Sequence, residues 1–253
     1  MDVLDFREFY TTPLGDIVHS EINGVISKIW PYFQAPLANA PSIQHTLGYG
    51  FTTPYLPEKS TYVTFMPAHT GVIGWPKNAP SRTALVEEDL LPLSDRCIDR
   101  LVIIHGFELC HNPVAFLEEC WRVLTHEGRL LIINPNRRGL WARIDTTPFG
   151  HGRPYTMTQL TKCLKDASFA PTQTLRSLYT PPFNSNLGIS LNPVFEKIGP
   201  YLFPKFSGLI AIEATKELYK AVPSASYSKR FKLNLATTYA GRQTASSSTP
   251  EKR

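Results

Sequence analysis

The chain has 253 residues, of which 42% are apolar and 19% are charged, with 22 prolines, 15 glycines and 4 cysteines. This length suits one large domain or two small ones, and the apolar fraction is high enough for a packed core, which excludes a chain that is disordered throughout. The longest apolar run is too short for a membrane-spanning helix, and the first residues have neither the basic nor the apolar region of a secretory signal.

The net charge of +5 belongs to the C-terminal end of the chain. Residues 221–253 hold six Lys and Arg and a single acid, Glu251, so the residues before them are neutral overall. We expect this Ser/Thr/Ala-rich segment to be disordered, because it offers too little apolar area to offset the entropy of ordering it. A basic tail can bind nucleic acid or anionic lipid, but it is more often a solvated chain end, so nucleic-acid binding is the weaker hypothesis.

The cysteines and histidines argue against a disulfide framework and against a metal site. The four cysteines form no CxxC pair, and the histidines have no HxxxH spacing. We therefore expect buried free thiols, no bound metal and a reducing, cytoplasmic location.

The first half of the chain predicts two helices and then strands. Phe6, Phe9 and Tyr10 share one helical face, and Thr12-Pro13 starts a second helix with an apolar stripe. A connecting loop is expected over residues 31–41. Three strands are predicted after it, at residues 42–47, 62–66 and 83–86. The first of them is expected to end in a sharp turn at Gly48-Tyr49-Gly50.

The second half alternates strands and helices more clearly. Residues 99–105 and 129–134 contain continuous apolar runs, which are typical of strands covered on both faces. Asn112-Pro113 supplies an N-cap and a first-turn proline for the helix between them, and Thr156 to Gln159 matches a capping box. Two last strands are predicted at residues 172–178 and 208–214.

This alternation predicts an α/β fold: a Rossmann-like, mostly parallel sheet flanked by helices. We expect an N-terminal helical cap at residues 1–41, a Rossmann-like domain at 42–220 and the disordered basic tail at 221–253. Ligands of such sheets bind beyond the carboxyl ends of the strands, where the strand order reverses. Candidate site residues are therefore sought in the segments that follow each predicted strand.

Several short motifs in the central part of the chain point to a family. They are an acidic run, a Leu-Pro-Leu, an Asp before the strand, an Arg-Val-Leu and a Gly-Arg-Leu, at residues 87–89, 91–93, 99, 122–124 and 128–130. Together they resemble the class I S-adenosylmethionine-dependent methyltransferases, in particular the methyltransferase type 11 group, over about residues 42–176. The resemblance implies a Rossmann-like methyltransferase domain, S-adenosyl-L-methionine as the cofactor, and methyl transfer to an unidentified acceptor.

The resemblance also assigns the cofactor-binding segments. Gly48, Tyr49 and Gly50 match the glycine-rich first loop, where glycine lets the backbone approach the cofactor. The chain departs from the family in lacking an acid at Thr46, a third glycine at Thr52, and a ribose-binding acid at the end of the second strand, residues 66–68.

The acidic run Glu87, Glu88 and Asp89 stands where the family binds adenine; alternatively it is a solvated loop. His105 follows the fourth strand, where the family places residues that face both cofactor and acceptor. It is a candidate base and cofactor contact, with Glu108 orienting it or the substrate. The alternative is that His105 only bonds a loop carbonyl.

His151 is the second candidate base. Arg137, Arg138, Arg153 and Tyr155 are candidate acceptor-binding residues that suit a carboxylate or phosphate, although Arg137 and Arg138 also fit a solvated helix start. The missing acids leave a rival hypothesis, a catalytically silent methyltransferase-like binding or partner protein. Side chains such as Phe51 or Met66 filling the cofactor hollow would favour that rival.

Overall fold

The computed structural model of the protein describes residues 1–31, 33, 45–56, 62–76, 79–182 and 190–217. The expected disordered tail, most of the expected loop over 31–41 and the start of the strand expected at 42–47 lie outside the described residues. All of the structure discussed below belongs to the compact unit Met1–Lys220.

Seven strands form one sheet with the order β3-β2-β1-β4-β5-β7-β6. The strands are β1 (Thr46–Gly50), β2 (Val63–Pro67), β3 (Thr83–Val86), β4 (Ile98–Ile104), β5 (Leu124–Pro135), β6 (Phe169–Ser177) and β7 (Leu209–Lys216). Neighbours pair in parallel except at β7, which is antiparallel to both β5 and β6. The predicted Rossmann-like, mostly parallel sheet is confirmed, and the strand order reverses between β1 and β4.

The turn expected at Gly48-Tyr49-Gly50 is wrong, because these residues are the second half of β1. Gly48 pairs with Thr64 of β2 on one side and with Val102 of β4 on the other. A strand that is hydrogen-bonded on both edges keeps Gly48 extended, and the chain begins to turn only at Gly50, whose φ is 81°. The strand therefore carries its glycines to the edge of the sheet.

Five helices have bounds in the described part of the chain: α1 (Val3–Phe9), α2 (Pro13–Ile29), α3 (Pro113–Val123), α4 (Met157–Asp166) and α6 (Asn192–Leu202). The predicted caps are present, since the side chain of Asn112 accepts from Ala115 N and Thr156 forms a capping box with Gln159. Among these helices, none is both long and apolar enough to cross a membrane.

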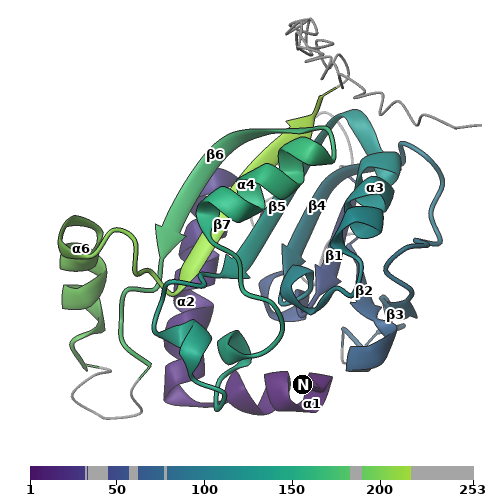
Figure 1. Ribbon diagram of the computed structural model, residues 1–253. Coiled ribbons are helices and arrows are strands. Elements are labelled where there is room, and N and C mark those ends of the chain that lie inside the picture. The colour runs from purple at the N-terminus through teal and green to yellow at the C-terminus, as the bar shows by residue number, and fades with distance from the viewer. Residues whose placement is uncertain (32, 34–44, 57–61, 77–78, 183–189, 218–253) are drawn as a thin grey trace, which may run out of the picture. The chain divides into compact units, whose positions relative to one another are not determined.

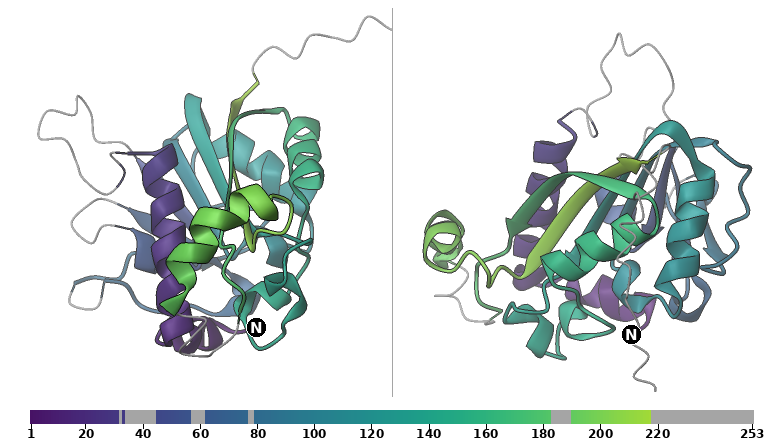
Figure 2. Two further views of the ribbon diagram at one scale, coloured as in Figure 1. Left: turned by 90° about the vertical axis from the view of Figure 1, so that its left-hand side faces the viewer. Right: turned by 45° about the horizontal axis from the view of Figure 1, so that its top comes forward.

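Alternate residues of the central strands feed two cores. Leu101 and Ile103 of β4 pack in the core under α3 and α4, whereas Val102 and Ile104 pack in the core under α2. All four are at most 1% exposed, as period-two alternation requires of a strand covered on both faces. Figure 2 shows α2 on one face of the sheet and α3 and α4 on the other.

The helix α1 lies across the carboxyl-terminal edge of the sheet, below the arrowhead of β4 in Figure 1. A tight corner joins it to α2: Thr12 Oγ1 donates to Phe9 O at 2.7 Å and accepts from Gly15 N at 3.0 Å. A Cβ at Gly15 would lie 2.2 Å from Phe9 O, so only glycine lets the end of α1 rest on the first turn of α2. The corner fixes α1 over the edge where ligands of this fold class bind.

Candidate functional site

Apolar side chains fill the space beyond the ends of β1 and β2. Val3 and Phe6 of α1 form a buried cluster with Phe51 and Met66, which are 5% and 1% exposed. The Phe51 ring stacks on Phe6 and on Tyr10, each at a centroid distance of 5.3 Å. We call the side chains of Val3, Phe6 and Tyr10 the N-terminal plug. On the described residues, Phe51 and Met66, which were named as able to fill the cofactor hollow, are thus buried beneath this plug.

A buried hydrogen-bonded chain lies behind the plug. The Tyr10 hydroxyl is 2.8 Å from His105 Nε2, and His105 Nδ1 is 3.2 Å from Glu108 Oε1. His105 and Glu108 are both 2% exposed, and Glu108 Oε2 has no hydrogen-bond partner among the described residues. Burial raises the pKa of the Tyr10 hydroxyl. The geometry allows His105 Nδ1 to donate to Glu108 Oε1 while Nε2 accepts a hydrogen bond from the Tyr10 hydroxyl.

The backbone at His105 is set by the sharp exit from β4. His105 has a φ of 51°, in the left-handed region that non-glycine side chains seldom adopt. This turn aims the imidazole back toward the edge of the sheet, where the rings of Phe6 and Phe149 each lie 5.0 Å from it. Such local strain is retained when the surroundings over-determine it, and it is enriched at functional sites. The predicted pairing of His105 with Glu108 is present; the loop carbonyl is not its partner.

The two glycines of β1 are required by packing. Gly50 has a φ of 81°, and a Cβ there would lie 2.3 Å from the carbonyl oxygen of Ile104. A Cβ at Gly48 would lie 2.2 Å from Thr52 Oγ1. The side chain of Tyr49 points into the core, with its ring 4.3 Å from that of Phe116, so only its backbone faces the edge of the sheet.

The predicted acidic run lines a pocket at the ends of β2 and β3. This pocket of about 380 Å³ is bounded by Pro67, Ala68, His69, Val86, Glu87, Glu88, Asp89, His111 and Asn112. Glu88 Oε1 accepts from Asn112 N at 2.7 Å and lies 3.9 Å from His111 Nδ1. Its Oε2 is buried and has no hydrogen-bond partner among the described residues.

An arginine clamp holds the loop that follows this pocket. Arg122 donates to both carboxylate oxygens of Glu119, to Asp95 Oδ1 at 2.7 Å, and to the carbonyl oxygens of Leu91 and Leu93. Its hydrogen bonds hold the pKa of Glu119 below the ordinary value. The spaced Leu-Pro-Leu and Arg-Val-Leu motifs are therefore two halves of one contact that positions the acidic run.

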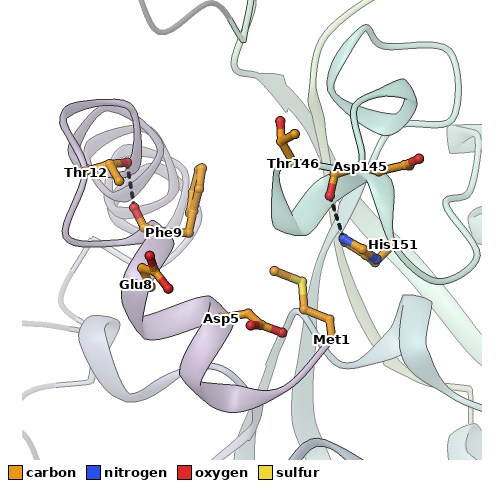
Figure 3. Close-up of a pocket in the computed structure, with 8 residues that line it drawn as sticks. All are labelled: Met1, Asp5, Glu8, Phe9, Thr12, Asp145, Thr146 and His151. Carbon is orange, nitrogen blue, oxygen red and sulfur yellow. Dashed lines mark hydrogen bonds between the residues drawn. The ribbon is translucent and has the colours of Figure 1, made fainter.

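A second pocket, of about 420 Å³, lies between α1 and the loop after β5 (Figure 3). Its walls are Met1, Asp5, Glu8, Phe9, Thr12, Asp145, Thr146 and His151. The predicted base His151 is here, with Nε2 2.8 Å from the carbonyl oxygen of Asp145. His105 does not line this pocket, and Phe149 packs against both His105 and Phe9. The two candidate bases are therefore separate: His151 lines this pocket, whereas His105 lies in the buried chain with Tyr10 and Glu108.

The candidate acceptor-binding residues are not gathered into either pocket. Arg137, Arg138 and Arg153 are exposed and line neither one. Tyr155 is half-buried with its ring 5.1 Å from Phe107, and burial raises the pKa of its hydroxyl. Arg153 contributes through its backbone, which donates to the carbonyl oxygen of Glu108 at 2.7 Å.

Sequence reasoning missed Tyr10 and Phe6 as site residues. Their signal was visible as an aromatic face on the first helix, but its partners Phe51 and His105 are distant in sequence. It also missed that Arg122 supports the acidic run. The available signal for this contact was the Arg-Val-Leu motif at residues 122–124.

Comparison with known proteins agrees with this geometry. The family whose description is "Methyltransferase domain" matches residues 46–132, which span β1 to most of β5. A probable S-adenosylmethionine-dependent methyltransferase of Mycolicibacterium smegmatis is 36% identical over 87 residues, 34% of this chain and 34% of that protein. One of Mycobacterium tuberculosis is 37% identical over 81 residues, 31% of this chain and 29% of that protein.

The chain thus matches only about a third of the length of these curated relatives. A solved structure from Thermotoga maritima, described as a possible histamine N-methyltransferase, is similar in fold, with a TM-score of 0.56 and 13% identity over 85% of this chain and 95% of that one. The resemblance to class I methyltransferases is confirmed for residues 46–132, and the methyltransferase Rossmann-like fold for the sheet and its helices.

Proposed function

We propose that the chain, which carries a methyltransferase domain at residues 46–132, transfers a methyl group from S-adenosylmethionine to an acceptor molecule. The observation that carries this proposal is the family match, which falls on the strands whose carboxyl ends flank the order reversal of the sheet. The acidic pocket and the buried His105–Glu108 pair lie at that same edge.

The two ends of the cofactor fit these residues differently. The pocket beside Glu87, Glu88 and Asp89 suits the adenosine end, because Glu88 Oε2 is an unpartnered acceptor for an amino group. The end of β2 offers Met66 and no acid for the ribose. The N-terminal plug packs on Phe51, the residue after Gly50, on the side of the sheet edge that the methionine end requires. Cofactor binding therefore requires α1 to withdraw.

The chain's own residues then align the acceptor and remove a proton. Bound S-adenosylmethionine supplies the methyl group together with its leaving group. With α1 withdrawn, His105 Nε2 is released from Tyr10 and can accept the proton of a hydroxyl or amine acceptor, while Glu108 holds the imidazole in the required tautomer. His151 is the alternative base if the acceptor occupies the second pocket, and the exposed arginines then serve an anionic acceptor.

Titration calorimetry with S-adenosylmethionine and S-adenosylhomocysteine tests cofactor binding. We expect heat of binding, and an adenosyl ligand in mass spectra of the purified chain. His105→Ala should retain cofactor affinity but lose incorporation of a radiolabelled methyl group into an extract of small molecules. The matched control is His126→Ala, since His126 is exposed on the amino-terminal half of β5. Equal incorporation by both variants would remove His105 as the base.

A specific observation favours a second candidate, a catalytically silent partner protein. The plug covers Phe51 and Met66, and the end of β2 has no acid for the ribose of the cofactor. If neither the native chain nor a plug variant such as Phe6→Ala binds S-adenosylmethionine at millimolar concentration, the silent hypothesis replaces the enzyme. A cytoplasmic location also remains part of the proposal, supported by four cysteines that are all free thiols.

A further inference from the structure

The helix α6 is mounted on the domain by its polar face. The Glu196 carboxylate accepts from three successive backbone N–H groups, those of Leu178, Tyr179 and Thr180, at 3.2, 2.5 and 3.0 Å. A Cβ at Gly199 would lie 2.4 Å from the Tyr179 side chain, so this position also sits tightly on the domain. Residues 196 and 199 share one helical face, and that face points inward.

The opposite face of α6, and the segment after it, are apolar and exposed. The residues that form this α6 apolar face, with their exposed fractions, are Val194 (48%), Ile198 (44%), Tyr201 (86%), Leu202 (63%), Phe203 (56%) and Phe206 (55%). Figures 1 and 2 show α6 standing out from the sheet, beyond β6. An ordinary surface helix has the reverse orientation, with its apolar stripe toward the core. A contiguous exposed apolar patch of this kind marks an interaction surface.

Cations border the α6 apolar face, and the nearest acid on a neighbouring element is the partly exposed Glu21 of α2, close to Glu196. Lys197 and Lys205 are exposed within the segment, and the one acid of residues 190–206, Glu196, is bonded inward. Asn136 Nδ2 donates to the carbonyl oxygen of Lys205 at 3.1 Å, which joins the loop carrying the exposed Arg137 and Arg138 to the end of this segment. On the described residues the border therefore carries four exposed cations, Arg137, Arg138, Lys197 and Lys205, against the partly exposed Glu21.

We propose that the α6 apolar face docks on an anionic lipid surface, with Tyr201, Phe203 and Phe206 inserted at the headgroup level and the neighbouring lysines and arginines on the lipid phosphates. Exposed aromatic and aliphatic side chains flanked by Lys and Arg are the composition of interfacial segments, and both contributions add to membrane affinity. A second copy of the chain fits this face less well, because pairing it with itself would bring like charges together. This inference does not depend on the proposed methyl transfer.

Flotation of the full chain with vesicles tests the proposal. We expect binding to phosphatidylcholine vesicles that contain phosphatidylglycerol, and much weaker binding to phosphatidylcholine alone. The combined variant Tyr201→Ser/Phe203→Ser should lower the partition coefficient at least about tenfold, because it removes the two most exposed aromatic insertions. The matched control Val114→Ser, at a residue 64% exposed on α3, should stay within about twofold of the native chain. Unchanged thermal unfolding by circular dichroism establishes that each variant is folded.

Three outcomes would overturn the proposal. The native chain could fail to float with either kind of vesicle. The Tyr201→Ser/Phe203→Ser variant could float with anionic vesicles as well as the native chain does, which would assign binding to the basic residues 221–253 alone. A dimer in light scattering that this variant dissociates, without any vesicle binding by the native chain, would assign the face to a second copy. Arg138→Gln/Lys205→Gln should weaken binding to anionic vesicles only, and an equal loss on neutral vesicles would contradict the role given to charge.

Discussion

Truncating Phe6 to alanine opens the N-terminal plug with the least change elsewhere. Phe6 is 3% exposed, and its ring contacts those of Phe51 and His105. The short helix α1, of 7 residues, is not stable by itself in water and is held on the sheet by its buried side chains. Phe6→Ala therefore weakens the closed position of α1 more than it weakens the domain beneath.

The magnitude follows from the burial of the ring. Complete burial of a phenylalanine side chain contributes about 2–3 kcal/mol, and a terminal helix recovers part of the loss by shifting on the sheet. A shift of about 2 kcal/mol in the equilibrium between closed and withdrawn α1 is about thirtyfold in population. The apparent affinity for a ligand is reduced by the fraction of molecules that are in the binding-competent state, here the state with α1 withdrawn. Phe6→Ala should therefore raise the affinity for S-adenosylhomocysteine by up to about thirtyfold.

Titration calorimetry with S-adenosylhomocysteine measures this gain directly. Ile22→Ala is the matched control, because Ile22 is also fully buried but lies on α2, in a core that is separate from the cluster around Phe6. It should lower the thermal stability without changing the affinity. A Phe6→Ala chain that is destabilised but binds the ligand no more tightly than the native chain refutes the argument, and weaker binding would make α1 a cover that contacts the ligand.

Three further predictions concern the support of the site. Gly50→Ala should lower the free energy of unfolding by more than about 2 kcal/mol in urea, because the residue has a positive φ and the new methyl group meets the Ile104 carbonyl; an unchanged midpoint would contradict the strand geometry. Arg122→Met should cost about 2 kcal/mol, since it removes the cation bound to Glu119 and the donors to two carbonyl oxygens, and hydrogen exchange should rise first in residues 91–95. Because the pKa of Glu119 is lower in the folded state than in the unfolded state, its ionised carboxylate stabilises the fold above the unfolded-state pKa. This stabilisation is lost as the pH falls through the folded-state pKa. Glu119→Gln should therefore make the free energy of unfolding less dependent on pH below about pH 4.5.

Local signals predicted the elements well. The capping box at Thr156 and the Asn112-Pro113 start are decided within one helical turn, and both are present. The continuous apolar run of β4 predicted a strand covered on both faces, because such strands lack alternating polar residues, and the structure has a strand there. Gly48 was assigned to a turn, because the ladders to β2 and β4 that hold it in the strand come from residues far along the chain.

The site was predictable where its partners are close in sequence. His105 and Glu108 are three residues apart after a strand, and the structure pairs them. Tyr10, the other partner of His105, is 95 residues away, and a single sequence offers no signal for such a contact. The candidate acceptor-binding arginines were chosen by composition alone, and nothing in their local sequence decides between a pocket and solvent.

The corner between α1 and α2 determines how the plug would behave in time. Every interaction that shapes it, from Thr12 to Phe9 and from Gly15 to the end of α1, lies within seven consecutive residues. Closing so short a stretch takes well under about a microsecond, whereas enzymes commonly turn over about 1–1000 times per second. Closing of α1 would then be much faster than a catalytic cycle, so the buried contacts of the N-terminal plug would set how tightly the cofactor is held and leave the speed of the chemical step unchanged.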